Sequence, residues 1–246
     1  MRLYKYRDLS ATEGPSFQRL SGILHRNAFW CARPSALNDE TEFIWNCNYE
    51  PTSATVPLLT DLLVKLKGRT PTEARATALV AVTNRLIEPI ARPVFEDMIR
   101  KCRQEIGLSC FGTSNDNKVM WQRYAGNGNG VCIEIDVPGE LLNEHLFPVE
   151  YPPAKVLRID QLLAAFTDPT QTRTIYSVAL LSKTPYWAPE KEIRFVSKRQ
   201  NVSVQISGSV ISHITLGPNL TPERRREVKL LVESLPYRLP LSTYEA

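Results

Sequence analysis

The chain lacks any run of 18 apolar residues, and its opening Met-Arg-Leu-Tyr-Lys-Tyr-Arg lacks the apolar stretch of a secretory signal. It also lacks Cys-x-x-Cys spacing, because its five cysteines are scattered at Cys31, Cys47, Cys102, Cys110 and Cys132. That pattern is typical of reduced cytosolic thiols and not of a disulfide framework. We therefore expect a cytoplasmic protein without a membrane span.

Several motifs of catalysis and binding are absent too. The histidines lie far apart, without the short His or Cys spacings of metal sites. No Gly-x-Ser-x-Gly turn is available to hold a serine nucleophile. The net charge of +4 is too small to indicate nucleic-acid binding. The sequence therefore implies no required cofactor and argues against a hydrolase of the serine type.

The glycine-rich stretch at residues 126–130 has the wrong context for a phosphate loop. Such loops follow a strand and open a helix, so that the helix amides meet the phosphates. Here a helical piece precedes the glycines and a strand follows them. We interpret the stretch as a tight turn.

Apolar periodicity indicates helices and strands without a regular alternation of the two. Strands are predicted at residues 3–7, 29–32, 108–111, 131–137, 147–151 and 190–196, with a hairpin at 202–206 and 210–216. Helices are predicted from a capping box at 10–13 to about 27, through most of 55–105, and at 118–125, 159–166, 172–181 and 221–234. We predict one α+β domain over residues 1–246, with a mixed or antiparallel sheet and a helical insertion at 54–106.

Inside the insertion, Thr70-Pro-Thr-Glu73 places Thr at the N-cap, Pro at the first helical position and Glu at the third. That arrangement is a specific signal for a helix start. Pro89 and Pro93 are predicted to break the helix that follows.

The segment Glu190-Lys-Glu-Ile-Arg194 carries the most ionisable chemistry on a predicted strand. Strand side chains alternate between faces, so Glu190, Glu192 and Arg194 are expected to share one face. Two interpretations stay open. The face is either a functional site or an exposed surface on which Arg194 pairs with a carboxylate.

Six ordered blocks cover nearly the whole chain outside the insertion. They are Leu3-Tyr-Lys-Tyr-Arg7, residues 29–42, Ser109-Cys-Phe111, Met120-Trp-x-x-Tyr-Ala125, Gly130-Val-Cys-Ile-Glu134 and Trp187-x-x-Glu-x-Glu-x-Arg194. Their order resembles a bacterial family called domain of unknown function 2971. That family often has a histidine near the glycine turn, where this chain has Gly128.

The order of a basic and aromatic first strand, a serine-bearing strand and a late Glu-x-Glu is also similar to that of ADP-ribosyltransferases. The resemblance implies a metal-independent enzyme with NAD as substrate, in which Glu192 is the catalytic carboxylate and Glu190 its partner. A carboxylate suits this chemistry because cleavage of the nicotinamide–ribose bond passes through an oxocarbenium-like state. Lys5 or Arg7 would meet phosphate, and Ser109 would lie on the middle strand. The Ser-Thr-Ser triplet of those enzymes is absent, and the acceptor, protein or nucleic acid, is left open.

A second hypothesis is a non-catalytic nucleotide or small-ligand module with a regulatory or defence role. Asn38, Asp39, Trp121, Tyr124 and Arg194 would then line a pocket. Tyr6 is a further ligand-binding candidate, since aromatic rings stack on nicotinamide or adenine. The third hypothesis, a metal-independent nuclease or phosphodiesterase, is disfavoured because the sequence lacks paired histidines.

Two structural expectations accompany these hypotheses. The strands at 3–7, 109–111, 131–137 and 190–196 should belong to one sheet. Asn38 or Asp39 should cap a segment that begins near residue 40, because Asn and Asp side chains accept backbone N–H bonds at turns and N-caps.

Overall fold

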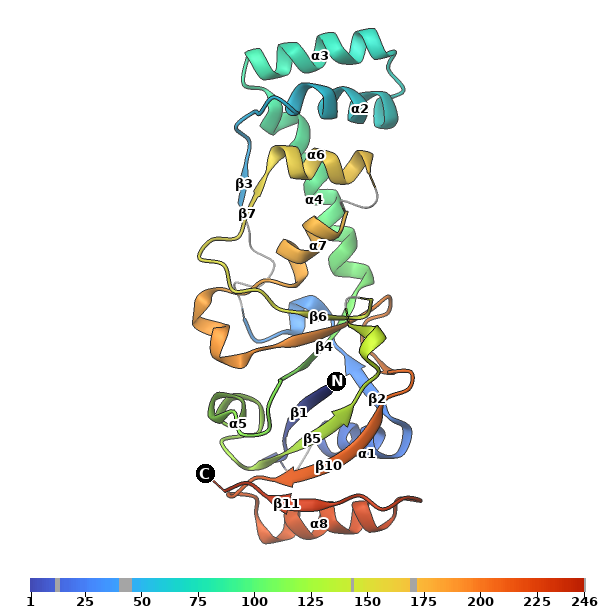
Figure 1. Cartoon of the computed structure of the whole chain (residues 1–246), viewed down its shortest axis with the longest axis vertical. Coiled ribbons are helices and arrows are strands. Elements are labelled where there is room, and N and C mark those ends of the chain that lie inside the picture. The colour runs from blue at the N-terminus through green and yellow to red at the C-terminus, as the bar shows by residue number, and fades with distance from the viewer. Residues whose placement is uncertain (12–13, 40–45, 143, 169–171, 246) are drawn as a thin grey trace. The chain divides into compact units, whose positions relative to one another are not determined.

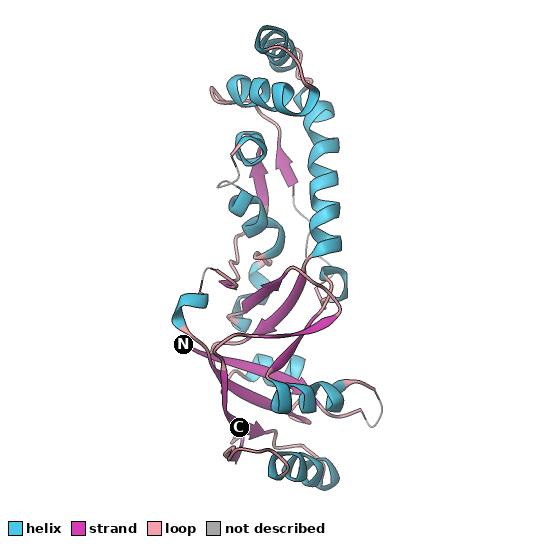
Figure 2. Cartoon of the chain, turned by 90° about the vertical axis from the view of Figure 1, so that its right-hand side faces the viewer, coloured by secondary structure: helices cyan, strands magenta, loops and turns pink. Residues whose placement is uncertain are grey.

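A computed structural model describes residues 1–11, 14–39, 46–142, 144–168 and 172–245 (Figure 1). The chain divides into two compact units. Unit 1 comprises residues 1–36, 106–149 and 186–246, and unit 2 comprises 37–105 and 150–185. Both units contain helices and strands (Figure 2), which confirms the α+β class. Residues 55–105 form three helices, which belong to unit 2. Unit 2 also includes residues 150–185, from later in the sequence.

The first sheet of unit 1 has the order β1-β5-β10-β11. These strands are β1 (Arg2–Asp8), β5 (Gly130–Asp136), β10 (Val210–Leu216) and β11 (Leu241–Thr243). Neighbours run antiparallel except for the parallel pair β10–β11. The alternation predicted for β5 is confirmed, because Val131, Ile133 and Ile135 are all fully buried in the core of unit 1.

The second sheet of unit 1 has the order β4-β8-β6 and is antiparallel. Its strands are β4 (Gly107–Phe111), β8 (Ile193–Ser197) and β6 (Leu146–Pro148), and a separate pair joins β2 (Ala28–Cys31) to β9 (Val202–Gln205). The expectation of one sheet is therefore wrong. Among the described residues, backbone pairing between β1 and the β4 segment is limited to an isolated bridge from Tyr4 to Gly112, directly after β4, so the predicted strands divide between two sheets.

The predicted hairpin of β9 and β10 is also wrong. β9 pairs with β2, whereas β10 pairs with β5. The turn between them contains Gly208 at φ 69°. This turn carries the chain from one sheet to another, and it does not close a hairpin.

The helices of unit 1 are α1 (Ser16–Arg26), α5 (Lys118–Tyr124) and α8 (Pro222–Glu233), with 3₁₀ turns η1 (Pro34–Ala36) and η2 (Gly139–Leu141). Thr221 caps α8 by accepting from the backbone N–H of Arg224, as predicted. The prediction that a helix begins at the capping box of residues 10–13 is wrong. Helix α1 begins at Ser16 after Pro15, and the Ser10 amide instead donates to Asp8.

Unit 2 contains α2 (Thr55–Lys67), α3 (Pro71–Thr83), α4 (Ile87–Glu105), α6 (Ile159–Thr167) and α7 (Thr172–Leu180). The short strands β3 (Asn46–Asn48) and β7 (Val156–Arg158) pair in parallel. The capping box of Thr70 and Glu73 is confirmed. Within the described part of the chain, no helix is both long enough and apolar enough to span a membrane.

The predicted helix break at Pro89 and Pro93 is wrong. Pro93 lies inside α4, which is continuous. Pro89 falls in the first turn, where a missing N–H costs nothing. The chain reverses earlier, at Arg85, whose φ is 55°.

Candidate functional site

The Glu190–Arg194 segment is not a simple alternating strand. Glu190 ends a 3₁₀ turn, η4 (Pro185–Glu190), and β8 begins only at Ile193. Lys191 between them has φ 46°, a left-handed conformation that interrupts strand alternation. The expectation that Glu190, Glu192 and Arg194 share one strand face is therefore wrong, because only Arg194 is on the strand.

The Glu190 side chain links the η4 turn to α5 through hydrogen bonds. Its Oε1 accepts from the Tyr124 hydroxyl at 2.9 Å and from Arg123 Nη1 at 3.1 Å, and the residue is 1% exposed. The Arg123 guanidinium carbon lies 4.4 Å from the Trp187 ring centroid and 4.7 Å from that of Tyr186. Glu190 and Tyr124 thus belong to a buried polar contact between two segments of unit 1.

Glu192 forms a buried ion pair with Arg194. Arg194 Nε donates to Glu192 Oε1 at 2.7 Å and Nη2 to Oε2 at 3.3 Å, with both residues at most 3% exposed. The interpretation of Arg194 as a partner of a carboxylate is therefore confirmed, although the pair is buried and not on an exposed face. Cys110 is the strand partner of Arg194. Burial raises the pKa of the Cys110 thiol and nearby Glu192 raises it further, which makes this cysteine a poor nucleophile.

Lys5 and Arg7 lie on one face of β1, the face that also carries buried Leu3. Lys5 Nζ donates to Ser109 Oγ at 3.2 Å and to the Cys110 carbonyl at 2.7 Å, and lies 5.0 Å from the Phe111 ring centroid. Burial, followed by the neighbouring charge of Arg7, lowers the pKa of Lys5 from 10.5 to about 8. The structure therefore brings together three of the predicted site residues, Lys5, Arg7 and Ser109.

Arg7 is a half-buried guanidinium that has another cation as its neighbour. Burial, followed by the charge of Arg19, lowers the pKa of Arg7 to about 10. Its buried Nε has no hydrogen-bond partner, and no carboxylate among the described residues forms an ion pair with it. The Arg19 guanidinium carbon stands 4.4 Å from the centroid of Trp30. We call Lys5, Arg7 and Arg19 the cation cluster.

The cation cluster is electrostatically unfavourable by itself. Removing a charge from water is costly unless an opposite charge or hydrogen bonds compensate for it, and like charges nearby add to that cost. Arg7 has neither kind of compensation within the described chain. An anion placed against Arg7 would supply both an opposite charge and hydrogen-bond acceptors.

Tyr6 and Trp121 lie on the opposite face of β1 from the cation cluster. Their rings meet edge to face at 5.3 Å, and Trp121 stacks on Tyr244 at 4.7 Å. The Tyr6 hydroxyl donates to the Ser114 carbonyl at 2.6 Å, and Trp121 Nε1 donates to that of Asn115 at 2.7 Å. Both residues are nearly fully buried and have structural partners, so the structure does not bring them into the cluster.

Asn38 and Asp39 belong to unit 2, whereas the cation cluster belongs to unit 1. The segment that they were expected to cap begins at residue 40, which lies outside the described residues. Arg19 and Trp30 were missed as members of the site. No motif in the sequence singles out Arg19, which is one cation of an amphipathic helix.

Searches among protein-family models, curated proteins and solved structures find no match for the chain. In the part of the chain that the structure describes, no group of three His, Cys, Asp or Glu side chains is arranged to hold a metal ion.

Proposed function

We propose that unit 1 binds a phosphate-bearing ligand at the cation cluster, with a pyrophosphate-containing nucleotide such as NAD as the leading candidate. The observation that carries this proposal is Arg7, a half-buried guanidinium beside two further cations and without an acidic partner in the described chain. A phosphate group would supply the missing charge and the missing hydrogen-bond acceptors.

The residues around Arg7 have complementary tasks in such a site. Arginine presents a planar fork that suits phosphate oxygens, and lysine adds a compact point charge. Ser109 is 1% exposed and accepts from Lys5, so it positions the ammonium group and does not itself face solvent. Trp30 adds an aromatic face beside Arg19, and aromatic faces in such positions stack on nucleobases.

ADP-ribosyl transfer is the second candidate function, and the proximity of Glu192 to Lys5 favours it. The Glu192 carboxylate acts electrostatically on both Lys5 and Cys110, so a carboxylate stands near the proposed phosphate site. In this reaction the C1′–nicotinamide bond of NAD breaks and nicotinamide leaves as the neutral base. The acceptor nucleophile bonds to C1′ and releases its proton to solvent. Glu192 would have to stabilise the developing cation while it remains paired with Arg194.

The binding proposal is tested by calorimetric titration of the full chain with NAD, ADP-ribose, ADP and inorganic pyrophosphate. Arg7→Gln should weaken binding at least tenfold, because a charge-assisted phosphate contact is lost. Arg226→Gln is the matched control, since it removes the same charge from an exposed position of α8. The proposal fails if none of the four ligands binds the wild-type chain, or if both variants weaken binding equally.

Nicotinamide release from NAD tests the second candidate. Release by the wild-type chain that disappears in Arg7→Gln would support transfer chemistry at this site. Binding of NAD without any release would leave the module as a binding protein and eliminate the transferase.

A further inference from the structure

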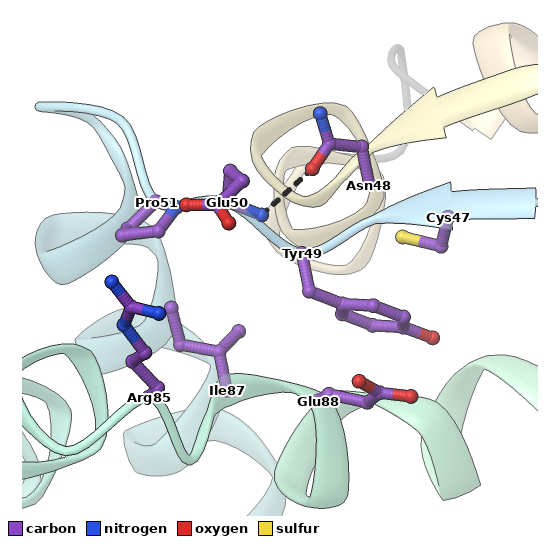
Figure 3. A pocket seen from close by; sticks show the side chains of 8 residues that line it. All are labelled: Cys47, Asn48, Tyr49, Glu50, Pro51, Arg85, Ile87 and Glu88. Carbon is purple, nitrogen blue, oxygen red and sulfur yellow. Dashed lines mark hydrogen bonds between the residues drawn. The ribbon is translucent and has the colours of Figure 1, made fainter.

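Unit 2 contains a cavity of about 330 Å³ between two of its connecting segments (Figure 3). Residues 47–51, which lead from β3 towards α2, line one side, and Arg85, Ile87 and Glu88 line the other. The volume lies at the lower end of the range for small-molecule sites, which is roughly 300–1,000 Å³. The cavity therefore suits a small metabolite and is too small for a dinucleotide.

Arg85 occupies a position at which glycine is usual. The Arg85 amide donates to the Val82 carbonyl at 3.3 Å and the Leu86 amide to the Ala81 carbonyl at 2.7 Å, the bonding pattern of a Schellman motif at the end of α3. The left-handed residue of that motif is most often glycine, because a Cβ is disfavoured there. Arginine at this position costs stability and places a guanidinium against the cavity.

Arg85 and Glu50 give the cavity opposite charges that do not neutralise each other. Neither side chain enters an ion pair or hydrogen bond with any described residue. Glu88 differs, because it pairs with Arg92, which also lies over the Tyr49 ring. Figure 3 shows the Arg85 side chain directed towards the segment that carries Glu50 and Pro51.

Besides Glu88 and the amide of Asn48, the remaining lining is apolar or aromatic. Ile87 is 2% exposed and forms an apolar wall, with Pro51 and the half-buried ring of Tyr49 also in the lining. A ligand that fits this distribution carries a negative group, a positive group and a short apolar portion.

We propose that this cavity binds a small amphoteric molecule of the α-amino acid class with an apolar side chain. Its carboxylate would pair with the fork of Arg85 and its ammonium group with Glu50. Its side chain would lie against Ile87 and Pro51. This site is independent of the cation cluster, because all its residues belong to unit 2.

The test is a thermal-shift and calorimetric titration of the full chain with three probes at millimolar concentration. L-Leucine has both charges, N-acetyl-L-leucine has only the carboxylate, and L-leucinamide has only the ammonium group. L-Leucine should raise the melting midpoint, since a ligand that binds the native state stabilises it. The two single-charge probes should bind at least tenfold more weakly.

Arg85→Gln should weaken L-leucine binding at least tenfold. Arg75→Gln is the matched control, because it removes a positive charge from an exposed position in the same unit and should leave binding unchanged. The proposal is overturned if L-leucine neither binds nor shifts the midpoint, if N-acetyl-L-leucine binds as well as L-leucine, or if the Arg85 variant binds normally.

Discussion

Lys5 Nζ on β1 donates a hydrogen bond of 3.2 Å to Ser109 Oγ on β4, across 104 positions in the sequence. The two strands belong to different sheets of unit 1. This bond, together with the 2.7 Å bond from Lys5 to the Cys110 carbonyl, fixes the ammonium group beside Arg7. The cation cluster is thus built where two sheets approach each other, and its geometry depends on both.

Arg7→Gln should stabilise the ligand-free chain. The substitution removes a half-buried charge that has cations as neighbours, so the free energy of unfolding should rise by on the order of 1 kcal/mol. Urea unfolding of wild type and variant measures the difference, with Arg226→Gln as the control that should change little. A loss of stability would show instead that Arg7 holds the fold together.

The Lys5 ammonium group should make stability depend on pH in the alkaline range. Its pKa is about 8 in the folded chain and near 10.5 when unfolded, so the unfolded state binds more protons between these values. The contribution of Lys5 to the free energy of unfolding therefore rises with pH across that window, by on the order of 3 kcal/mol in total.

The comparison of wild type with Lys5→Met measures this contribution, because titratable groups remote from Lys5 behave alike in both proteins. The wild-type chain should gain stability relative to the variant as the pH rises from 8 to 10.5. Parallel stability curves for the two proteins would show that the pKa of Lys5 is not lowered on folding.

Glu192→Gln should destabilise the chain strongly. It leaves the Arg194 guanidinium, which is 1% exposed, without its bidentate carboxylate, and breaking a buried pair typically costs about 3–5 kcal/mol. Glu227→Gln is the control, since its ion pair with Arg224 is half exposed and should contribute at most about 1 kcal/mol. An unchanged melting curve for Glu192→Gln would argue that this carboxylate is kept for chemistry and not for structure.

Arg85→Gly should stabilise the ligand-free chain by about 1 kcal/mol, because glycine adopts the left-handed conformation without strain. Arg75→Gly should have the opposite sign and cost about 1 kcal/mol, since it places glycine in the interior of α3. Denaturant unfolding of both variants measures the two effects. Destabilisation by Arg85→Gly would show that the arginine side chain supports the fold.

Local signals in the sequence predicted most elements but not their pairing. The alternation in β5 and the Thr70–Glu73 capping box are local patterns, and both are confirmed. Strand pairing is non-local, so nothing near Gly208 reveals that β9 and β10 belong to different sheets. The left-handed Lys191 is likewise unexpected, because a positive φ is uncommon outside glycine.

The candidate site was predictable only in part. Lys5, Arg7 and Ser109 were named from their order along the chain, and the structure places them together. Arg19 approaches Arg7 through the packing of α1 against β1, which no short motif encodes. The two carboxylates of the Glu-x-Glu motif have separate partners, Arg123 and Tyr124 for Glu190 and Arg194 for Glu192.

The division of unit 1 into three chain segments has a consequence for its biosynthesis. β1 pairs with β5 in a register that joins Arg2 to Asp136, so the first strand leaves the ribosome long before its partner does. The helix pair α2–α3 needs only neighbouring residues and can form in the meantime. β5 in turn acquires its second neighbour only when β10 is synthesised. A chain that stops before residue 210 would thus expose the edge of β5 beside Ile133 and Ile135, and such an unpaired apolar edge is prone to aggregation.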